Sequence, residues 1–179
     1  HRLFRRQRQM CIRDRHYFSP IPDPETLPVS LEETVAGDSL PVLNLIIGSN
    51  RNESLMYIPE GAELTDYLEG YFPPENWEDI KAMLGADLSE LAQMDRLRSA
   101  LRYTCPSLSL AQAAQEAGGS AYVYRFDRMR ESFEAIGAYH GAELPYVFDT
   151  HDPWMPTNAI DHQITCLLYT SDAADETTG

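Results

Sequence analysis

The sequence predicts an α/β fold in which two strands are joined by several helices. The segment Val42–Ile47 is short, apolar and rich in β-branched residues, and Pro41 and Gly48 flank it. This pattern is typical of a strand that is buried on both faces of a parallel sheet. β-branched and aromatic residues favour a second strand at Ala121–Asp127. Because parallel strands need a long crossover connection, the order strand, helices, strand predicts a β-α-β unit.

Apolar side chains at helical spacing, together with proline and glycine, define the helices. Glycine favours a helix stop, as after Ala36, and proline favours the first turn, as at Pro106. The predicted helices are Leu31–Ala36, Gly61–Gly70, Glu75–Leu84, the stretch that carries Leu88, Leu91, Met94, Leu97 and Leu101, and the segment from Pro106 to Gly118-Gly119.

The chain is strongly acidic, with 14 basic and 28 acidic side chains in 179 residues and a formal net charge of -14. Nucleic acids and anionic membranes both require basic surface, so neither is an expected partner. Tyr122, Tyr124 and Phe126 are accordingly interpreted as core residues and not as a platform for stacking bases. The sequence contains no run of 18 apolar residues, so it predicts no membrane-spanning helix. No glycine-rich nucleotide loop is present, so no nucleotide cofactor is expected.

The two ends of the chain are related through the genetic code. Residues 166–176 can be encoded by a DNA sequence whose reverse complement translates as Arg5–Asp14. That DNA resembles a transposase-type sequencing-library adapter, so residues 1–15 and 166–179 are expected to be non-native. The remaining body, residues 16–165, holds 8 basic and 24 acidic side chains, which give a net charge of -16, and Cys105 is its one cysteine.

Several acids and histidines near the carboxyl end could suggest a metal site. Their spacing fits no standard ligand pattern, and we expect no metal. The residues concerned are Asp149, His151, Asp152, Asp161 and His162.

Two polar loops follow the two predicted strands. The first, Gly48–Ser54, carries Glu53, a carboxylate that could orient a histidine. The second, Gly137–Phe148, carries His140 between Gly137 and Gly141 and beside an acid, where an accessible imidazole can act as a general base near neutral pH. Taken singly, each side chain also fits an ordinary surface residue. In α/β folds, however, catalytic groups collect at the carboxyl ends of strands.

Taken together, these motifs resemble the type-B carboxylesterase and cholinesterase family, which has the α/β-hydrolase fold. The resemblance spans most of residues 18–165 and implies the C-terminal portion of an α/β-hydrolase sheet, about two parallel strands with crossover helices in an incomplete domain. The motifs that carry it are Asp23–Leu27, Gly48-x-Asn50-x-x-Glu53, Cys105-Pro106, Tyr122–Phe126 and Gly137-Ala-x-His140-Gly-x-Glu143-Leu-Pro-Tyr-x-Phe148.

The resemblance implies a catalytic role for two residues and a supporting role for a third. It implies that Glu53 is the acid and His140 the general base of a Ser-His-Glu triad, with Glu143 a further acid beside the histidine. The chain order of acid before histidine agrees with the α/β-hydrolase pattern. The implied substrate is a small-molecule carboxylic ester, and no cofactor is implied. The resemblance assigns no oligomeric state, and it assigns no compartment because a signal peptide would lie upstream.

Two essential parts of the family pattern are missing from the sequence. The nucleophile motif G-x-S-x-G does not occur, and the glycine-rich oxyanion loop is also missing. We therefore expect a carboxylesterase fragment that is inactive alone. The alternative is a fragment of a non-catalytic, cholinesterase-like adhesion or binding protein, which could dispense with the acid and the histidine.

Overall fold

The computed structural model describes residues 23–25, 28–37, 40–131, 133–151, 153–154 and 156–173. The chain divides into two compact units, residues 1–39 and 40–179. Of the two ends predicted to be non-native, residues 1–15 lie outside the described residues, and residues 166–173 continue the last helix.

In the first unit, helix α2 spans Leu31–Ala36, the range predicted from the sequence. The Ser30 hydroxyl accepts a hydrogen bond from the Glu33 N–H at 3.1 Å, and the Glu33 carboxylate accepts one from the Ser30 N–H at 3.0 Å. This reciprocal capping box satisfies two backbone donors at the start of the helix, and Gly37 ends it.

The second unit contains both strands and the remaining helices. Each predicted helix is found, with bounds that differ by a few residues. The elements are β1 (Leu45–Asn50), a 3-10 turn (Leu55–Tyr57), α3 (Leu64–Tyr71), a 3-10 turn (Pro74–Asn76), α4 (Trp77–Leu84), α5 (Glu90–Ser99), a π-helical turn (Ala100–Thr104), α6 (Cys105–Glu116), β2 (Ala121–Phe126), a 3-10 turn (Glu134–Ile136), α7 (Leu144–Val147) and α8 (Ala159–Ala173). None of the described helices is long and apolar enough to cross a membrane.

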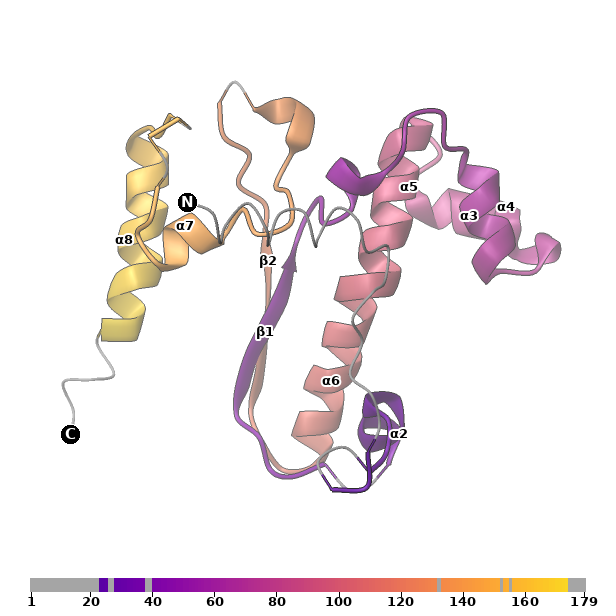
Figure 1. Cartoon of the computed structure of the whole chain (residues 1–179), viewed down its shortest axis with the longest axis horizontal. Coiled ribbons are helices and arrows are strands. Elements are labelled where there is room, and N and C mark those ends of the chain that lie inside the picture. The colour runs from indigo at the N-terminus through magenta and orange to yellow at the C-terminus, as the bar shows by residue number, and fades with distance from the viewer. Residues whose placement is uncertain are drawn as a thin grey trace, which may run out of the picture. The chain divides into compact units, whose positions relative to one another are not determined.

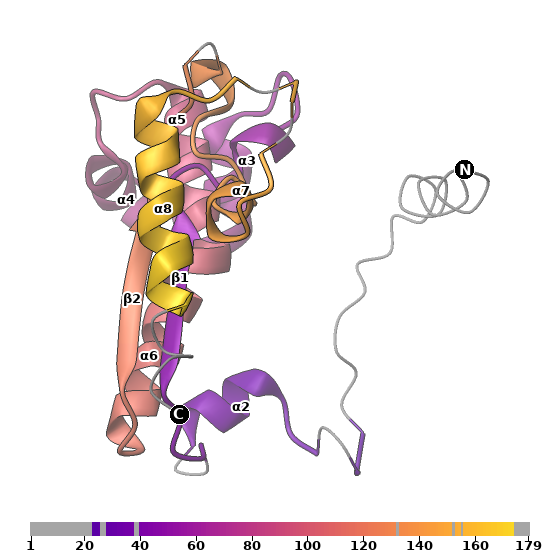
Figure 2. The same ribbon diagram turned by 90° about the vertical axis from the view of Figure 1, so that its left-hand side faces the viewer.

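Strands β1 and β2 pair in parallel, which confirms the predicted β-α-β connection (Figure 1). Leu45 lies opposite Ala121, and the register continues to Asn50 opposite Phe126. Figures 1 and 2 show α6 on one side of the strand pair, with α7 and α8 on the other side, toward the carboxyl ends of the strands.

The prediction that the first strand is buried on both faces is wrong. The neighbouring side chains Ile46 and Tyr122 are 76% and 70% exposed, and Tyr124 is also exposed. Helix α6 packs against the opposite face, where the Ser49 hydroxyl lies 3.1 Å from that of Thr104. Among the described residues, α7 and the loop before it cover the other face only near the strand ends. Of the three aromatic residues predicted to be core, Phe126 alone is therefore buried.

Two clusters of buried apolar side chains hold the helices and the loop after β2 in place. One joins α3, α4 and α5 through Leu64, Leu68, Ile80, Leu84, Met94 and Leu97. The other packs Phe126 of β2 against Ala138, Ala142 and Tyr146, all within the segment Gly137–Phe148. The first cluster fixes α5 and the second fixes the loop that follows β2.

Helices α5 and α6 form one continuous helical segment, whereas the sequence predicts a new helix at Pro106. The π-helical turn Ala100–Thr104 connects them without a break. Proline cannot donate a helical hydrogen bond, and a local π turn absorbs such an irregularity. At this turn Thr104 contacts Ser49 of β1.

Candidate active site

The two predicted catalytic side chains, Glu53 and His140, are in direct contact. The Nδ1 atom of His140 lies 2.6 Å from Oε2 of Glu53, although 87 positions separate them in the chain. Each residue lies in the loop that follows one of two adjacent parallel strands, so the fold places both loops at one edge of the sheet. The Glu53 side chain is buried, whereas that of His140 is 47% exposed.

The carboxylate of Glu53 accepts a hydrogen bond at each oxygen. Oε1 accepts from the backbone N–H of Asn50 at 2.6 Å, and Oε2 faces the imidazole. Because a carboxylate only accepts, we assign the proton of a neutral His140 to Nδ1. Nε2 then carries the lone pair of the ring, and within the described residues it has no hydrogen-bond partner. The arrangement is that of a histidine ready to accept a proton.

Glu143 is linked to the site through Asn50. The buried side-chain amide of Asn50 donates both to the Glu143 carboxylate and to the carbonyl oxygen of Tyr139, the latter at 2.7 Å. Tyr139 directly precedes His140, so Asn50 ties the end of β1 to the histidine loop. Glu143 therefore contacts Asn50, which also holds the backbone of the residue before His140.

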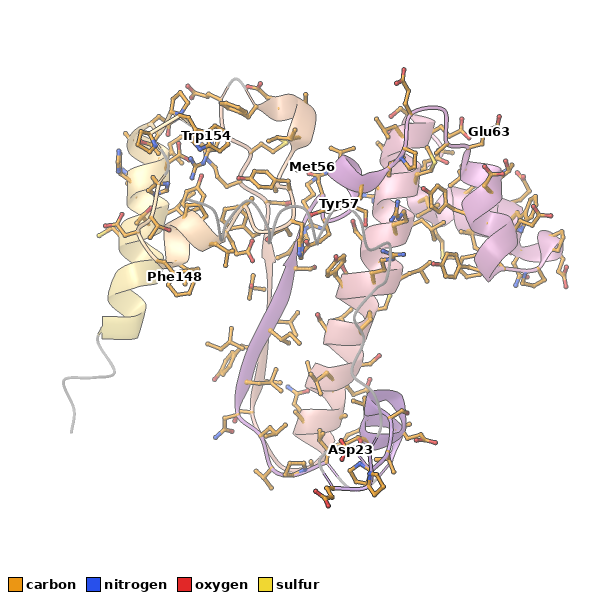
Figure 3. All side chains as sticks on the ribbon, in the orientation of Figure 1. Asp23, Met56, Tyr57, Glu63, Phe148 and Trp154 are labelled. Carbon is orange, nitrogen blue, oxygen red and sulfur yellow. The ribbon has the colours of Figure 1, made fainter. Side chains whose placement is uncertain are left out.

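Two aromatic rings flank the imidazole. The ring of Tyr103, from the π-helical turn, lies 5.2 Å from that of His140, and Tyr57 approaches edge-on at 6.3 Å. Burial, followed by the charge of Glu53, raises the pKa of Tyr103. Met56 and Tyr57 lie beyond the carboxyl end of β1, at the edge of the sheet that carries the site (Figure 3). Sequence reasoning missed both tyrosines, because no local pattern relates them to His140.

Two of the acids and histidines near the C-terminal end of the chain contact arginines. The described residues contain no group of three or more histidine, cysteine or acidic side chains placed to hold a metal ion. Asp161 instead pairs with Arg128 at 2.7 Å, and His151 contacts Arg130 at 2.7 Å. Asp152 lies outside the described residues.

The site lies in two loops at the carboxyl ends of adjacent parallel strands, and a comparison of the sequence with known protein families gives a consistent result. The sequence model of the carboxylesterase family matches residues 2–165, and the chain belongs to this family, whose fold is the α/β-hydrolase fold. Among individual proteins, the chain is 26% identical over 145 residues to the para-nitrobenzyl esterase of Bacillus subtilis (strain 168). That alignment covers 76% of this chain and 28% of the relative.

Solved structures support the same fold. Two structures of PNB esterase superpose with TM-scores of 0.67 and 0.70 at 23% and 22% identity, over 90% and 96% of this chain. The Aspergillus niger protein EstA superposes with a TM-score of 0.61 at 19% identity over 87% of this chain. The chain spans only 35%, 38% and 32% of these three structures.

Proposed function

We propose that this chain is the acid- and histidine-bearing part of a serine carboxylesterase that uses a Ser-His-Glu triad. The observation that carries the proposal is the 2.6 Å contact between the buried Glu53 carboxylate and Nδ1 of His140. Membership of the carboxylesterase family and the similarity to an enzyme named para-nitrobenzyl esterase support an ester substrate.

In the proposed reaction, Nε2 of His140 takes the proton of the serine hydroxyl as the serine oxygen attacks the ester carbonyl. Glu53 holds the ring orientation and stabilises the imidazolium that forms. His140 then returns the proton to the departing alcohol, which leaves an acyl-serine. Water releases the acid in a second cycle of the same proton transfers.

We propose that the serine and the oxyanion-binding N–H groups come from outside this chain. The 179 residues contain no G-x-S-x-G motif. Residues 16–165 would then belong to a longer protein, called the full-length protein below, and residues 1–15 and 166–179 would be non-native. Without a nucleophile, the isolated chain is expected to be inactive.

The test is to recover the complete gene from its source DNA and to assay the purified product with p-nitrophenyl acetate. We expect the gene to encode G-x-S-x-G upstream of residue 16, and the full-length protein to hydrolyse the ester. The 179-residue chain is expected to release p-nitrophenol no faster than free imidazole does at equal concentration. A full-length protein with another residue in place of that serine, and no hydrolysis, would contradict the proposal and indicate a binding protein.

A further inference from the structure

The carboxylate of Asp95, on α5, contacts Asn52 and Ser54, the two residues that flank Glu53. The residue is 2% exposed. Its oxygens accept three hydrogen bonds, and no ion pair to Asp95 is recorded within the described part of the chain. A buried charge without a counter-ion costs free energy unless hydrogen bonds replace its hydration. The three hydrogen bonds replace that hydration and tie the carboxylate to the loop after β1 and to Ser99 of its own helix.

One oxygen of Asp95 fixes the acid loop. Oδ1 accepts from the backbone N–H of Ser54 at 3.0 Å and from the hydroxyl of Ser99 at 3.2 Å. The Ser99 hydroxyl lies 3.2 Å from the same N–H. Because Ser54 directly follows Glu53, these contacts fasten the backbone beside Glu53 to α5, which the first hydrophobic cluster holds in place.

The other oxygen sets the orientation of the Asn52 side chain. Oδ2 accepts from Nδ2 of Asn52 at 2.8 Å. Since a carboxylate cannot donate, the amide must turn its nitrogen toward Asp95 and its oxygen away. Oδ1 of Asn52 then accepts from the backbone N–H of Ala138 at 3.1 Å, and the Asn52 N–H donates to the Ala138 carbonyl at 3.0 Å. Ala138 lies two residues before His140.

We propose that Asp95 is a positioning residue for the Glu53–His140 pair, an inference that rests on the proposed esterase function. Through Ser54 it holds the loop of the acid, and through Asn52 it holds the loop of the histidine. One buried carboxylate thus fixes the positions of both loops, and the contact between Glu53 and His140 depends on those positions during proton transfer.

The test compares four forms of the full-length protein. Asp95→Asn keeps the shape of the side chain but places an NH₂ group against a donor. The double variant Asp95→Asn/Asn52→Asp reverses the donor and the acceptor of that hydrogen bond, while residue 52 still accepts from Ala138. Glu90→Gln is the matched control, because Glu90 also lies on α5 and accepts from a backbone N–H, that of Leu64 at 2.8 Å, outside the site. The unaltered protein is the reference.

We expect Asp95→Asn to lower kcat by roughly ten- to a hundredfold, with KM changed less than about twofold, because small misplacements of catalytic groups have costs of this size. The double variant should recover most of the rate, and Glu90→Gln should keep it. A fully active Asp95→Asn variant, or a folded double variant as slow as the single one, would overturn the proposal. If Asp95→Asn does not fold, Ser99→Ala removes one hydrogen bond of the same cluster and is expected to lower kcat by a smaller factor; unchanged kcat would count against the proposal.

A second readout separates this proposal from the proposed function. In protein labelled with ¹⁵N-histidine, the Nδ1–H of His140 should give a low-field proton resonance that is lost in Asp95→Asn and restored in the double variant. If the unaltered protein shows the resonance but hydrolyses no ester, the proposed function fails while the positioning role is still tested. A resonance unchanged in Asp95→Asn would overturn the positioning role.

Discussion

Gly137 lies so close to Asn52 that a Cβ atom at position 137 would overlap the Asn52 side-chain amide. Gly137 also has a φ of +62°, in the region that L-residues with a side chain rarely adopt. The amide oxygen concerned is the one that accepts from the N–H of Ala138. The histidine loop therefore passes the acid loop at a separation that only glycine permits.

Gly137→Ala should disturb the site through both effects, and Gly61→Ala supplies the matched control. Gly61 has a φ of +77° but open space where a Cβ would lie, so alanine there introduces backbone strain alone. In the full-length protein, we expect Gly61→Ala to lower the free energy of unfolding by about 1–2 kcal/mol and to leave kcat unchanged. Gly137→Ala should lower the free energy of unfolding by about 1–3 kcal/mol more than Gly61→Ala does. It should also abolish most of the ester hydrolysis. Urea titration and steady-state kinetics measure the two quantities. Equal effects of the two variants would contradict the close approach of the loops.

Stability should fall as the pH drops below about 6.5, because folding lowers the pKa of His151 and so disfavours its protonated form. Its Nδ1 faces the guanidinium of Arg130, and its Nε2 lies 2.7 Å from the hydroxyl of Thr165. Burial, then the charge of Arg130 and that of His162, lowers the pKa of His151 from 6.5, against the opposing charges of Asp149 and Asp161. The unfolded chain therefore takes up this proton at a higher pH than the folded one does. The contribution of His151 is present above 6.5 and is lost as the pH falls toward its folded-state pKa.

The measurement is the urea midpoint of the full-length protein between pH 7.5 and pH 5. His151→Gln should reduce the decrease of the midpoint over this range, whereas His162→Gln, at an exposed position, should keep most of it. The protonation of Asp161 in the folded protein changes little between pH 7.5 and pH 5. Burial raises the pKa of Asp161, but hydrogen bonds from Arg128, the backbone of Asn158 and Tyr146 outweigh burial and hold its pKa well below 3.8. A midpoint whose pH dependence is the same with and without His151 would contradict this assignment.

The 179-residue chain alone should self-associate through the exposed face of its strand pair. Ile46 and Tyr122 are exposed neighbours on adjacent strands, and exposed apolar strand surface promotes association. The double variant Ile46→Thr/Tyr122→Thr keeps residues that favour strands and should shift the chain toward the monomer in sedimentation velocity. Met83→Thr, at an exposed position on α4, should not. A monomeric, cooperatively melting chain without substitutions would contradict the prediction.

The elements that could be predicted from the sequence are those with local physical causes. The bounds of α2 follow from its capping box and Gly37, and the two strands follow from β-branched and aromatic runs. The apolar pattern places the start of β1 three residues too early, at Val42, because apolar character alone does not indicate strand pairing. The same pattern ends the strand at Ile47, whereas β1 continues to Asn50. The pairing with β2 extends through Gly48, Ser49 and Asn50, which no hydrophobic pattern indicates.

The site was predictable only in part, for a similar reason. The motifs around Glu53 and His140 indicate the pair, but Asn52 and Asp95 act through contacts between segments more than 40 residues apart. One local feature could have indicated Asp95. It lies four residues after Leu91, next to the apolar stripe of its helix, where an acid is unusual.

The most direct test of the Glu53–His140 pair is a double-mutant cycle on kcat/KM for p-nitrophenyl acetate in the full-length protein. We expect Glu53→Gln to lower kcat/KM roughly 10³- to 10⁴-fold and His140→Ala roughly 10⁵- to 10⁶-fold, with Glu60→Gln, an exposed acid nearby, unchanged. Because Glu53 acts through His140, the double variant Glu53→Gln/His140→Ala should be no slower than His140→Ala alone. Independent, multiplying losses, or full activity in either single variant, would contradict the triad.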